Sequence, residues 1–316
     1  MNKTRLYLAL LVLLASCSTP ERYYLTEGAI FHTTAHIKYL YHRDLGEEIY
    51  ARLDSFDLSL NPFNPQSIIY KVNHNEPVEV DDWFITVFNK AQEISALTGG
   101  AYDITCAPLI SLWGFGTDNL GEPTVHAIDS IRAFVGYRKV RLDGRRVVKA
   151  DPRVQLNASS LAKGYAVDLV AELLESQGIA DYVVEIGGEV RAHGVNPKGD
   201  EWRIGISKPP DDTTDTTDTT QEQMEVVSLH NTSIATSGNY RNYYVRDGKK
   251  VAHTINPLTG YPAQTDLLSV SIFYPDCLTA DAVATACMVI GSDSAQVLIS
   301  RFQGMTNINY STTLPD

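Results

Sequence analysis

The stretch Asn157-Ala-Ser-Ser-Leu-Ala-Lys-Gly-Tyr-Ala-Val-Asp168 decides how the rest of the chain is interpreted. A β-rich run, Val154–Leu156, precedes it, and Ser159 and Ser160 are candidate N-caps of a helix. Gly178 stands where the C-terminal cap of that helix is expected. The apolar residues between these ends recur at helical spacing: Ala166, Leu169, Val170, Leu173 and Leu174. The stretch therefore predicts a strand, a tight polar turn and a helix.

The start of this helix has the chemistry of an anion site. Lys163 and Gly164 fall in its first turn, after two serine hydroxyls. Free backbone N–H groups and an ammonium at a helix N-terminus attract anions. The spacing matches neither a Walker P-loop nor a GxGxxG fingerprint, so the usual nucleotide-binding folds are not indicated. An ordinary capped helix would contain the same residues, so the choice between the two depends on the rest of the chain.

The N-terminus has the pattern of a lipoprotein signal peptide. Lys3 and Arg5 precede the apolar run Leu6–Leu14, which is too short to span a membrane. The run ends in Leu-Ala-Ser-Cys, which matches the bacterial lipobox. We therefore expect residues 1–16 to be removed and Cys17 to carry the lipid, although a secretory signal with an incidental cysteine remains the alternative. The expected location is the bacterial cell envelope, lipid-anchored and facing the periplasm.

Composition indicates a globular protein of 316 residues, with 44% hydrophobic and 20% charged residues. Removal of Lys3 and Arg5 takes the formal net charge from −12 to −14. Such a protein repels nucleic acid and anionic lipid, so no nucleic-acid partner is expected and membrane attachment depends on acyl chains. The three remaining cysteines form no disulfide framework and are expected to be buried thiols: Cys106, Cys277 and Cys287.

Beyond the signal peptide, residues 17–27 are expected to be a flexible tether and residues 28–316 one domain. Within the domain, residues 211–220 are a low-complexity Asp/Thr segment that we interpret as a solvated loop between two strands. Strands are predicted at 29–39, 182–186 and 267–274, hairpins at 138–149 and around Asp247-Gly248, and helices at 45–56, 81–98 and 279–290. Hairpin-linked strands with interspersed helices predict an α+β fold: a single compact domain with largely antiparallel sheets.

Two groups of residues outside the opening stretch can support chemistry. Asp281 and Thr285 are four residues apart in a predicted helix, so their carboxylate and hydroxyl share one face. Oxygen ligands with little protein charge suit Mg²⁺, although such a pair is commonly just an exposed helix face. His253 comes at the end of a hairpin strand, before the turn 256–260. It could assist proton transfer, or it could simply hydrogen-bond that turn.

Taken together, these segments resemble the ApbE family, the FAD:protein FMN transferases. The resemblance covers nearly all of the mature chain, and its motifs are specific in combination. They follow one another in order: Ser67 and Asn73, Gly100–Asp103, Leu112–Phe115, Asn157–Asp168, Glu185–Gly188, Ala235–Tyr240, His253–Gly260 and Asp281–Thr285.

The resemblance implies that the protein takes FAD as its substrate and uses Mg²⁺ to split the pyrophosphate. FMN would pass to a Thr or Ser hydroxyl of an acceptor protein in the envelope, and AMP would leave. It implies metal ligation by the Ala162 carbonyl, Asp281 and Thr285, and phosphate-proximal or catalytic roles for His253, Lys163 and Asp281. The implied flavin contacts are Phe31, Phe63, Ala101, Tyr102, Asp103, Ser159, Tyr165 and Ile255.

The chain departs from the family pattern near the flavin. Phe31-His32-Thr33 stands where the family usually has Met-Gly-Thr, and Ser67 is followed by Ile68 where Glu is frequent. The Pro-rich loop is rearranged, which leaves Phe63 as the ring that would stack on the flavin. These departures bear on flavin orientation and not on the metal or phosphate positions. Two other functions stay open: an FAD pyrophosphatase that releases FMN and AMP, and a non-catalytic FAD-binding lipoprotein.

Overall fold

A seven-stranded sheet runs through the protein in the order β1-β2-β5-β6-β9-β14-β15, and each neighbouring pair is antiparallel. The structure, a computed structural model, describes residues 20–116, 123–209, 224–239, 243–246 and 249–311. Alternation of buried and half-exposed residues in Tyr182–Ile186 is the period-2 pattern of a strand with one face in the core. The sheet strands are β1 Arg22–Ile30, β2 Thr33–Tyr41, β5 Tyr182–Ile186, β6 Glu189–His193, β9 Thr232–Gly238, β14 Leu267–Tyr274 and β15 Thr306–Ser311.

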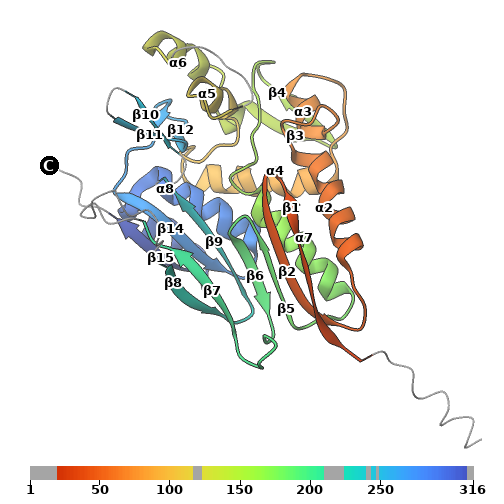
Figure 1. Cartoon of the computed structure of the whole chain (residues 1–316). Coiled ribbons are helices and arrows are strands. Elements are labelled where there is room, and N and C mark those ends of the chain that lie inside the picture. The colour runs from red at the N-terminus through yellow and green to blue at the C-terminus, as the bar shows by residue number, and fades with distance from the viewer. Residues whose placement is uncertain (1–19, 117–122, 210–223, 240–242, 247–248, 312–316) are drawn as a thin grey trace, which may run out of the picture.

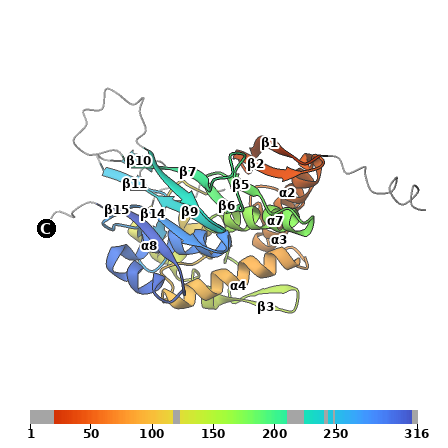
Figure 2. The ribbon, with the colours of Figure 1, turned by 90° about the horizontal axis from the view of Figure 1, so that it is seen from below.

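Helices cover one face of this sheet in two layers (Figure 1 and Figure 2). Helices α7 (Ala162–Ser176) and α8 (Cys277–Ile299) pack directly on the strands, and α2 (Gly46–Leu60) lies beside α7. Helix α4 (Asp82–Leu97) packs on α8 from the side away from the sheet. Because α8 is enclosed between the sheet and α4, its sequence is apolar on nearly all sides. It bends at Gly291, whose φ is 79°.

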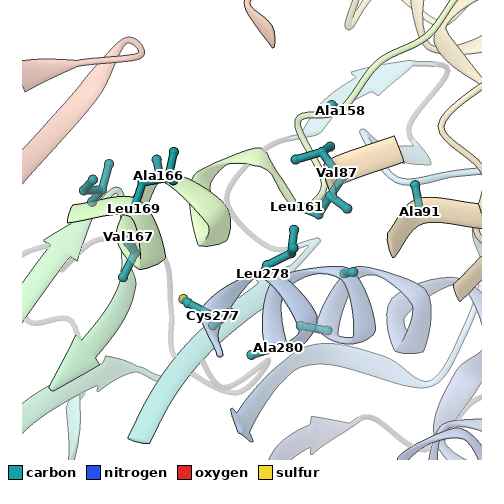
Figure 3. Packing of buried hydrophobic residues seen from close by; sticks show 14 of the residues in the cluster. Val87, Ala91, Ala158, Leu161, Ala166, Val167, Leu169, Cys277, Leu278 and Ala280 are labelled. Carbon is teal, nitrogen blue, oxygen red and sulfur yellow. The ribbon is translucent and has the colours of Figure 1, made fainter. Parts of the chain in front are cut away.

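Small side chains let these helices approach closely. Figure 3 shows residues from α4, α7 and α8 and from the segment that leads into α7 converging on one core. The alanines there leave room for backbones to pack near one another, and the surrounding branched residues fill the remaining space. The labelled residues are Val87, Ala91, Ala158, Leu161, Ala166, Val167, Leu169, Cys277, Leu278 and Ala280.

A hairpin covers part of the opposite face of the sheet. Strands β7 (Trp202–Ser207) and β8 (Met224–Leu229) pair with each other and enclose a second, smaller core. Residues 211–220 come between these two paired strands in the sequence and lie outside the described residues. The second core consists of Val190, Ala192, Trp202, Ile206, Leu229 and Ile234.

The remaining elements gather beyond one end of the sheet and frame the site described below (Figure 1). Among them, the predicted hairpin 138–149 is confirmed. The strands predicted on either side of Asp247-Gly248 pair over Tyr243–Arg246 and Lys249–Ala252. These elements are α3 Ile68–Asn73, α5 Ala107–Leu112, α6 Val125–Arg132, the 3₁₀ turn Tyr137–Lys139, β3 Val140–Asp143, β4 Arg146–Lys149, β10 Tyr243–Arg246, β11 Lys249–Ala252, β12 Ile255–Asn256 and β13 Tyr261–Pro262.

The α+β class, the largely antiparallel pairing and the single domain are confirmed. Strand 267–274 has the predicted bounds, and the predicted helix 279–290 lies within the longer α8. Cys277 and Cys287 are buried free thiols as expected, while Cys106 is only partly buried. Residues 1–19, including Cys17, lie outside the described residues.

Two predictions at the start of the domain are wrong. The tether was expected to reach residue 27, but Arg22–Ile30 pairs along its whole length with β2. β1 is the edge strand of the sheet and its residues are mostly exposed or half-exposed, so its polar sequence resembles a linker. The single strand expected at 29–39 is interrupted by a hairpin turn at Phe31 and His32, with φ of 50° and 60°.

Two local predictions around the opening stretch are also wrong. Residues 154–156 form no strand beyond one bridge at Gln155, because the side chain of Asn73 accepts from Leu156 N (2.7 Å) and donates to Leu156 O (2.9 Å). Neither serine caps α7, which begins after Leu161 without a side-chain cap. Ser159 hydrogen-bonds Asn157 and Ser160 hydrogen-bonds Tyr102, so both hydroxyls are engaged elsewhere.

Candidate active site

A cavity of about 420 Å³ lies where the start of α7, the middle of α8, the end of β9 and the loops around α5 and β12 meet. A larger hollow, of about 550 Å³ between α3 and the β3–β4 hairpin, contains none of the predicted site residues. The 420 Å³ cavity brings together most of them: Ala101, Tyr102, Asp103, Ser159, Lys163, His253, Ile255, Asp281 and Thr285.

The N-terminal ends of α7 and α8 are joined by reciprocal carboxylate contacts. Asp281 in α8 accepts a hydrogen bond from Gly164 N in α7 at 3.0 Å. In return Asp168 in α7 accepts from Cys277 N at 3.0 Å and Leu278 N at 2.8 Å. Each carboxylate thus binds free N–H groups of the other helix. Helix α7 has no side-chain cap of its own, whereas α8 is also capped by Asp276, which accepts from Thr279 N. Arg191 holds Asp168 at 2.9 Å, and this arrangement fixes where Asp281 stands in the cavity wall.

Gly164 allows this close approach. A Cβ at this position would lie 2.3 Å from the Cys277 carbonyl oxygen and 2.8 Å from Asp281 Cβ. Both are far shorter than van der Waals contact, and one of the two is a backbone atom that cannot rotate away. The glycine in the opening stretch is therefore needed for helix packing next to the site.

Lys163 and Glu189 form a buried ion pair at the cavity. Their Nζ–Oε1 distance is 2.7 Å, and the Glu189 side chain is only 4% exposed. Burial, followed by the negative charge of Asp281, raises the pKa of Glu189, against the opposing effect of Lys163. Burial also acts to lower the pKa of Lys163, but Glu189 and Asp281 outweigh it and raise that pKa. Lys163 is therefore an ammonium, which pairs with Glu189 and is also attracted by the charge of Asp281.

The oxygen atoms around Asp281 suit a hard divalent cation. Burial raises the pKa of Asp281, so a nearby positive charge would favour its ionised form. The Thr285 hydroxyl lies 3.1 Å from the Ser237 hydroxyl and 3.4 Å from the Ser160 carbonyl oxygen. Among the described residues no group of three or more His, Cys, Asp or Glu side chains gathers. One carboxylate with neutral oxygens fits Mg²⁺, which retains water and phosphate ligands, better than it fits zinc.

The wall opposite α8 is built from the 101–106 turn and the 157–160 segment. Asp103 accepts from Thr105 N at 2.7 Å, and burial raises the pKa of its carboxyl. The Tyr102 hydroxyl lies 2.8 Å from the Ser160 hydroxyl, and burial raises the pKa of Tyr102 far above its ordinary value. These hydrogen bonds hold both side chains in place, and the raised pKa keeps Tyr102 neutral. This wall can therefore orient a ligand by hydrogen bonds and shape.

His253 lies between β11 and β12 and lines the cavity. Its ring meets that of Phe115 edge to face, with centroids 6.3 Å apart. The next residue, Thr254, donates to the Asn239 side chain at 2.7 Å, which ties this segment to the end of β9. The geometry thus places an imidazole at the cavity wall and leaves both its predicted roles open.

Three predicted residues line a neighbouring hollow of about 190 Å³ instead: Phe31, Phe63 and Ala162. The two hollows share Ser159 and Lys163, so they adjoin. Tyr165 lines neither of them. Its ring packs against Phe56, 5.7 Å between centroids, and contributes to the main core.

The sequence prediction missed Glu189 as a site residue, together with the hydroxyls of Ser160 and Ser237. A charged residue directly after Gly187-Gly188 was the available signal for Glu189, but burial could not be inferred from that dipeptide. Ser160 was considered only as a candidate helix cap, and Ser237 only as part of the Ala235–Tyr240 motif. Their proximity to Thr285 depends on how β9 packs over α8.

Comparisons with known proteins agree with the family resemblance seen in the sequence. The model of the ApbE family matches residues 31–308. An FAD:protein FMN transferase of Vibrio cholerae is 36% identical, with 90% of this chain and 87% of that protein covered. One from Haemophilus influenzae is 36% identical, with 91% and 86% covered. Among solved structures, the flavin transferase ApbE from Vibrio cholerae superposes with a TM-score of 0.82 at 33% identity, covering 93% of this chain and 95% of that one. The apo flavinyl transferase of Pseudomonas stutzeri gives 0.80 at 32%, with 93% and 95% covered.

Proposed function

The chain belongs to the ApbE family, and on this premise we propose that it is a Mg²⁺-dependent FAD:protein FMN transferase. Its substrates are FAD and a protein with a Thr or Ser acceptor hydroxyl. The observation that carries the proposal is the convergence of Lys163, Asp281 and Thr285 on one cavity. An ammonium and a hard-cation site beside each other are what a pyrophosphate requires.

In the proposed reaction the acceptor hydroxyl oxygen attacks the FMN-side phosphorus of FAD. The bond between that phosphorus and the bridging oxygen breaks, and AMP leaves with the bridging oxygen. The hydroxyl proton passes to a base in the cavity, for which His253 and Asp281 are the candidates. FMN is then joined to the protein through a phosphoester, and no electrons are exchanged.

The residues of the chain contribute position and charge. Asp281, Thr285 and the Ala162 carbonyl would hold Mg²⁺, which when bound neutralises phosphate charge. Lys163 binds a phosphate oxygen by charge and hydrogen bonding, and the wall containing Asp103, Tyr102 and Ser159 orients the rest of FAD. The rings of Phe31 and Phe63 in the adjoining hollow would contact the flavin. Phosphoryl transfer depends on positioning and charge more than on covalent help, which suits this set of residues.

One incubation with FAD and Mg²⁺, with and without an acceptor domain, distinguishes the transferase from the two other functions. A covalent flavoprotein with release of AMP supports the transferase. Free FMN in the absence of acceptor indicates an FAD pyrophosphatase, in which water replaces the hydroxyl. Unchanged FAD in both reactions indicates a non-catalytic FAD-binding protein and would overturn the proposal.

His253→Ala tests the base. If His253 takes the hydroxyl proton, the maximal transfer rate falls by about 10²–10⁴-fold with little change in FAD affinity. The pH–rate profile then loses the limb that an imidazole titration gives. If His253 only supports the 256–260 turn, thermal stability and FAD affinity fall together and the profile keeps its shape. Rates measured against pH for both proteins decide between these roles, and we expect the first.

Cys17→Ala tests the proposed location, in which a lipid anchor attaches the protein to the bacterial envelope on the periplasmic side. The Leu-Ala-Ser-Cys segment is the one acylation signal we find in the sequence, so the variant should lack acyl mass and leave the membrane fraction. Intact-mass measurement and fractionation of cells expressing the full chain provide the readout. A variant that still carries acyl chains would show that the lipobox interpretation is wrong.

A further inference from the structure

Glu189 is the first residue of β6 and comes directly after the tight Gly187-Gly188 turn that joins β5 to β6. Both glycines have positive φ, 63° and 99°, which side chains rarely adopt. The turn brings Glu189 to the cavity, where its side chain is almost fully buried. Neither the family's implied ligands nor the predicted catalytic residues include it.

The carboxylate of Glu189 is only half satisfied. Oε1 is bound by Lys163 Nζ at 2.7 Å, while Oε2 is buried and has no hydrogen-bond partner among the described residues. Burying a charged group with incomplete hydrogen bonding costs stability, and an apolar replacement of similar volume is often no worse for the fold. A structural role in the core therefore does not account for a glutamate here.

The same turn also lies against the stem of the Lys163 side chain. A Cβ added at Gly187 would lie 3.4 Å from Lys163 Cδ, so the backbone of the turn runs along the lysine stem. Glu189 then holds the ammonium at the tip. The Lys163 side chain is thus contacted near Cδ by the turn and at Nζ by Glu189, which limits the many rotamers of a free lysine. This restraint comes from β5 and β6 and not from α7, which carries the lysine.

We propose that Glu189 is a positioning residue for FMN transfer, which holds the Lys163 ammonium at the place of the FAD pyrophosphate. The inference rests on the function proposed above. Without the ion pair the ammonium would move among rotamers and bind the phosphates in many geometries. Displacements of this order, about 1 Å, can cost about 10²-fold in rate. The Glu189 carboxylate also stabilises the charged form of Lys163 in a site from which water must be excluded.

A double-mutant cycle tests this assignment on the full chain, with FAD turnover, FAD affinity and thermal midpoint measured for each protein. The variants are Glu189→Gln, Lys163→Gln and the double replacement. We expect Glu189→Gln to lower kcat by about 10–10²-fold with a smaller change in KM. In the Lys163→Gln background the same replacement should have little further effect, because there is no ammonium left to hold. Glu189→Asp should recover part of the rate, since it keeps the charge.

A matched control removes an ion pair of the same kind outside the cavity. Lys90 Nζ and Glu93 Oε2 on α4 are 2.8 Å apart, and the Glu93 side chain is 47% exposed and outside the cavity, so Glu93→Gln should retain wild-type rates. Full activity of Glu189→Gln, or losses that add in the double variant, would overturn the inference. So would a loss of rate that follows the thermal midpoint alone. If the wild-type protein itself leaves FAD unchanged, the proposed function fails, which is a different result from failure of the Glu189 assignment.

Discussion

Asp281→Ala is expected to abolish Mg²⁺-dependent turnover of FAD. Asp281 is the one carboxylate among the proposed metal ligands, and its position is fixed by the hydrogen bond from Gly164 N. Loss of the charge removes the main attraction for the cation in a buried site. The protein should stay folded, because removal of a buried carboxylate also removes its desolvation cost. Turnover at saturating Mg²⁺, together with circular dichroism, provides the measurement.

Two further variants distinguish the loss of the charge from the loss of a neutral ligand. Asp281→Asn keeps an acceptor for Gly164 N but not the charge, so it should be as inactive as Asp281→Ala if the metal matters. Thr285→Ala should lose less, because water can replace a neutral hydroxyl in the shell of Mg²⁺. Wild-type turnover by Asp281→Ala at high Mg²⁺ would remove Asp281 from the site and from the list of candidate bases.

Gly164→Ala is expected to damage stability and activity together. The added methyl would meet the Cys277 carbonyl oxygen at 2.3 Å, so α7 and α8 must separate. Overpacking of this kind costs about 1–3 kcal/mol of the free energy of unfolding. Separation of the helices also breaks the Gly164–Asp281 hydrogen bond, and a shift of about 1 Å at the site can cost about 10²-fold in rate. Chemical denaturation and FAD turnover measure the two effects.

Gly46→Ala is the matched control. Gly46 is the first residue of α2, and a Cβ there would find its nearest neighbours at 3.4 Å, on the side chains of Asp44 and Thr26. This variant should keep wild-type turnover and lose little stability. If Gly164→Ala behaves like Gly46→Ala, the close packing of the two helix ends does not control the site.

The sequence by itself was sufficient for features that depend on local pattern. Apolar spacing located α2, α4 and α7, because periodicity reports which face of a helix is buried. The strands predicted at 182–186 and 267–274 match β5 and β14 in their bounds. The chemistry of Lys163, Asp281 and Thr285 made them candidates for a phosphate or metal site, but their spacing also fits an ordinary helix start and an exposed helix face. The resemblance to the ApbE family is what favoured the functional interpretation.

Local pattern could not identify the hydrogen-bond and packing partners that come from distant parts of the chain. The serines looked like caps of α7, but the free N–H of Gly164 is bound by Asp281, a residue 117 positions away. Residues 154–156 looked like a strand, but Asn73 satisfies their backbone. Glu189 became a site residue only because the Gly187-Gly188 turn brings it to Lys163. In each case a long-range contact competes with a local preference, and only the tertiary structure decides which contact forms.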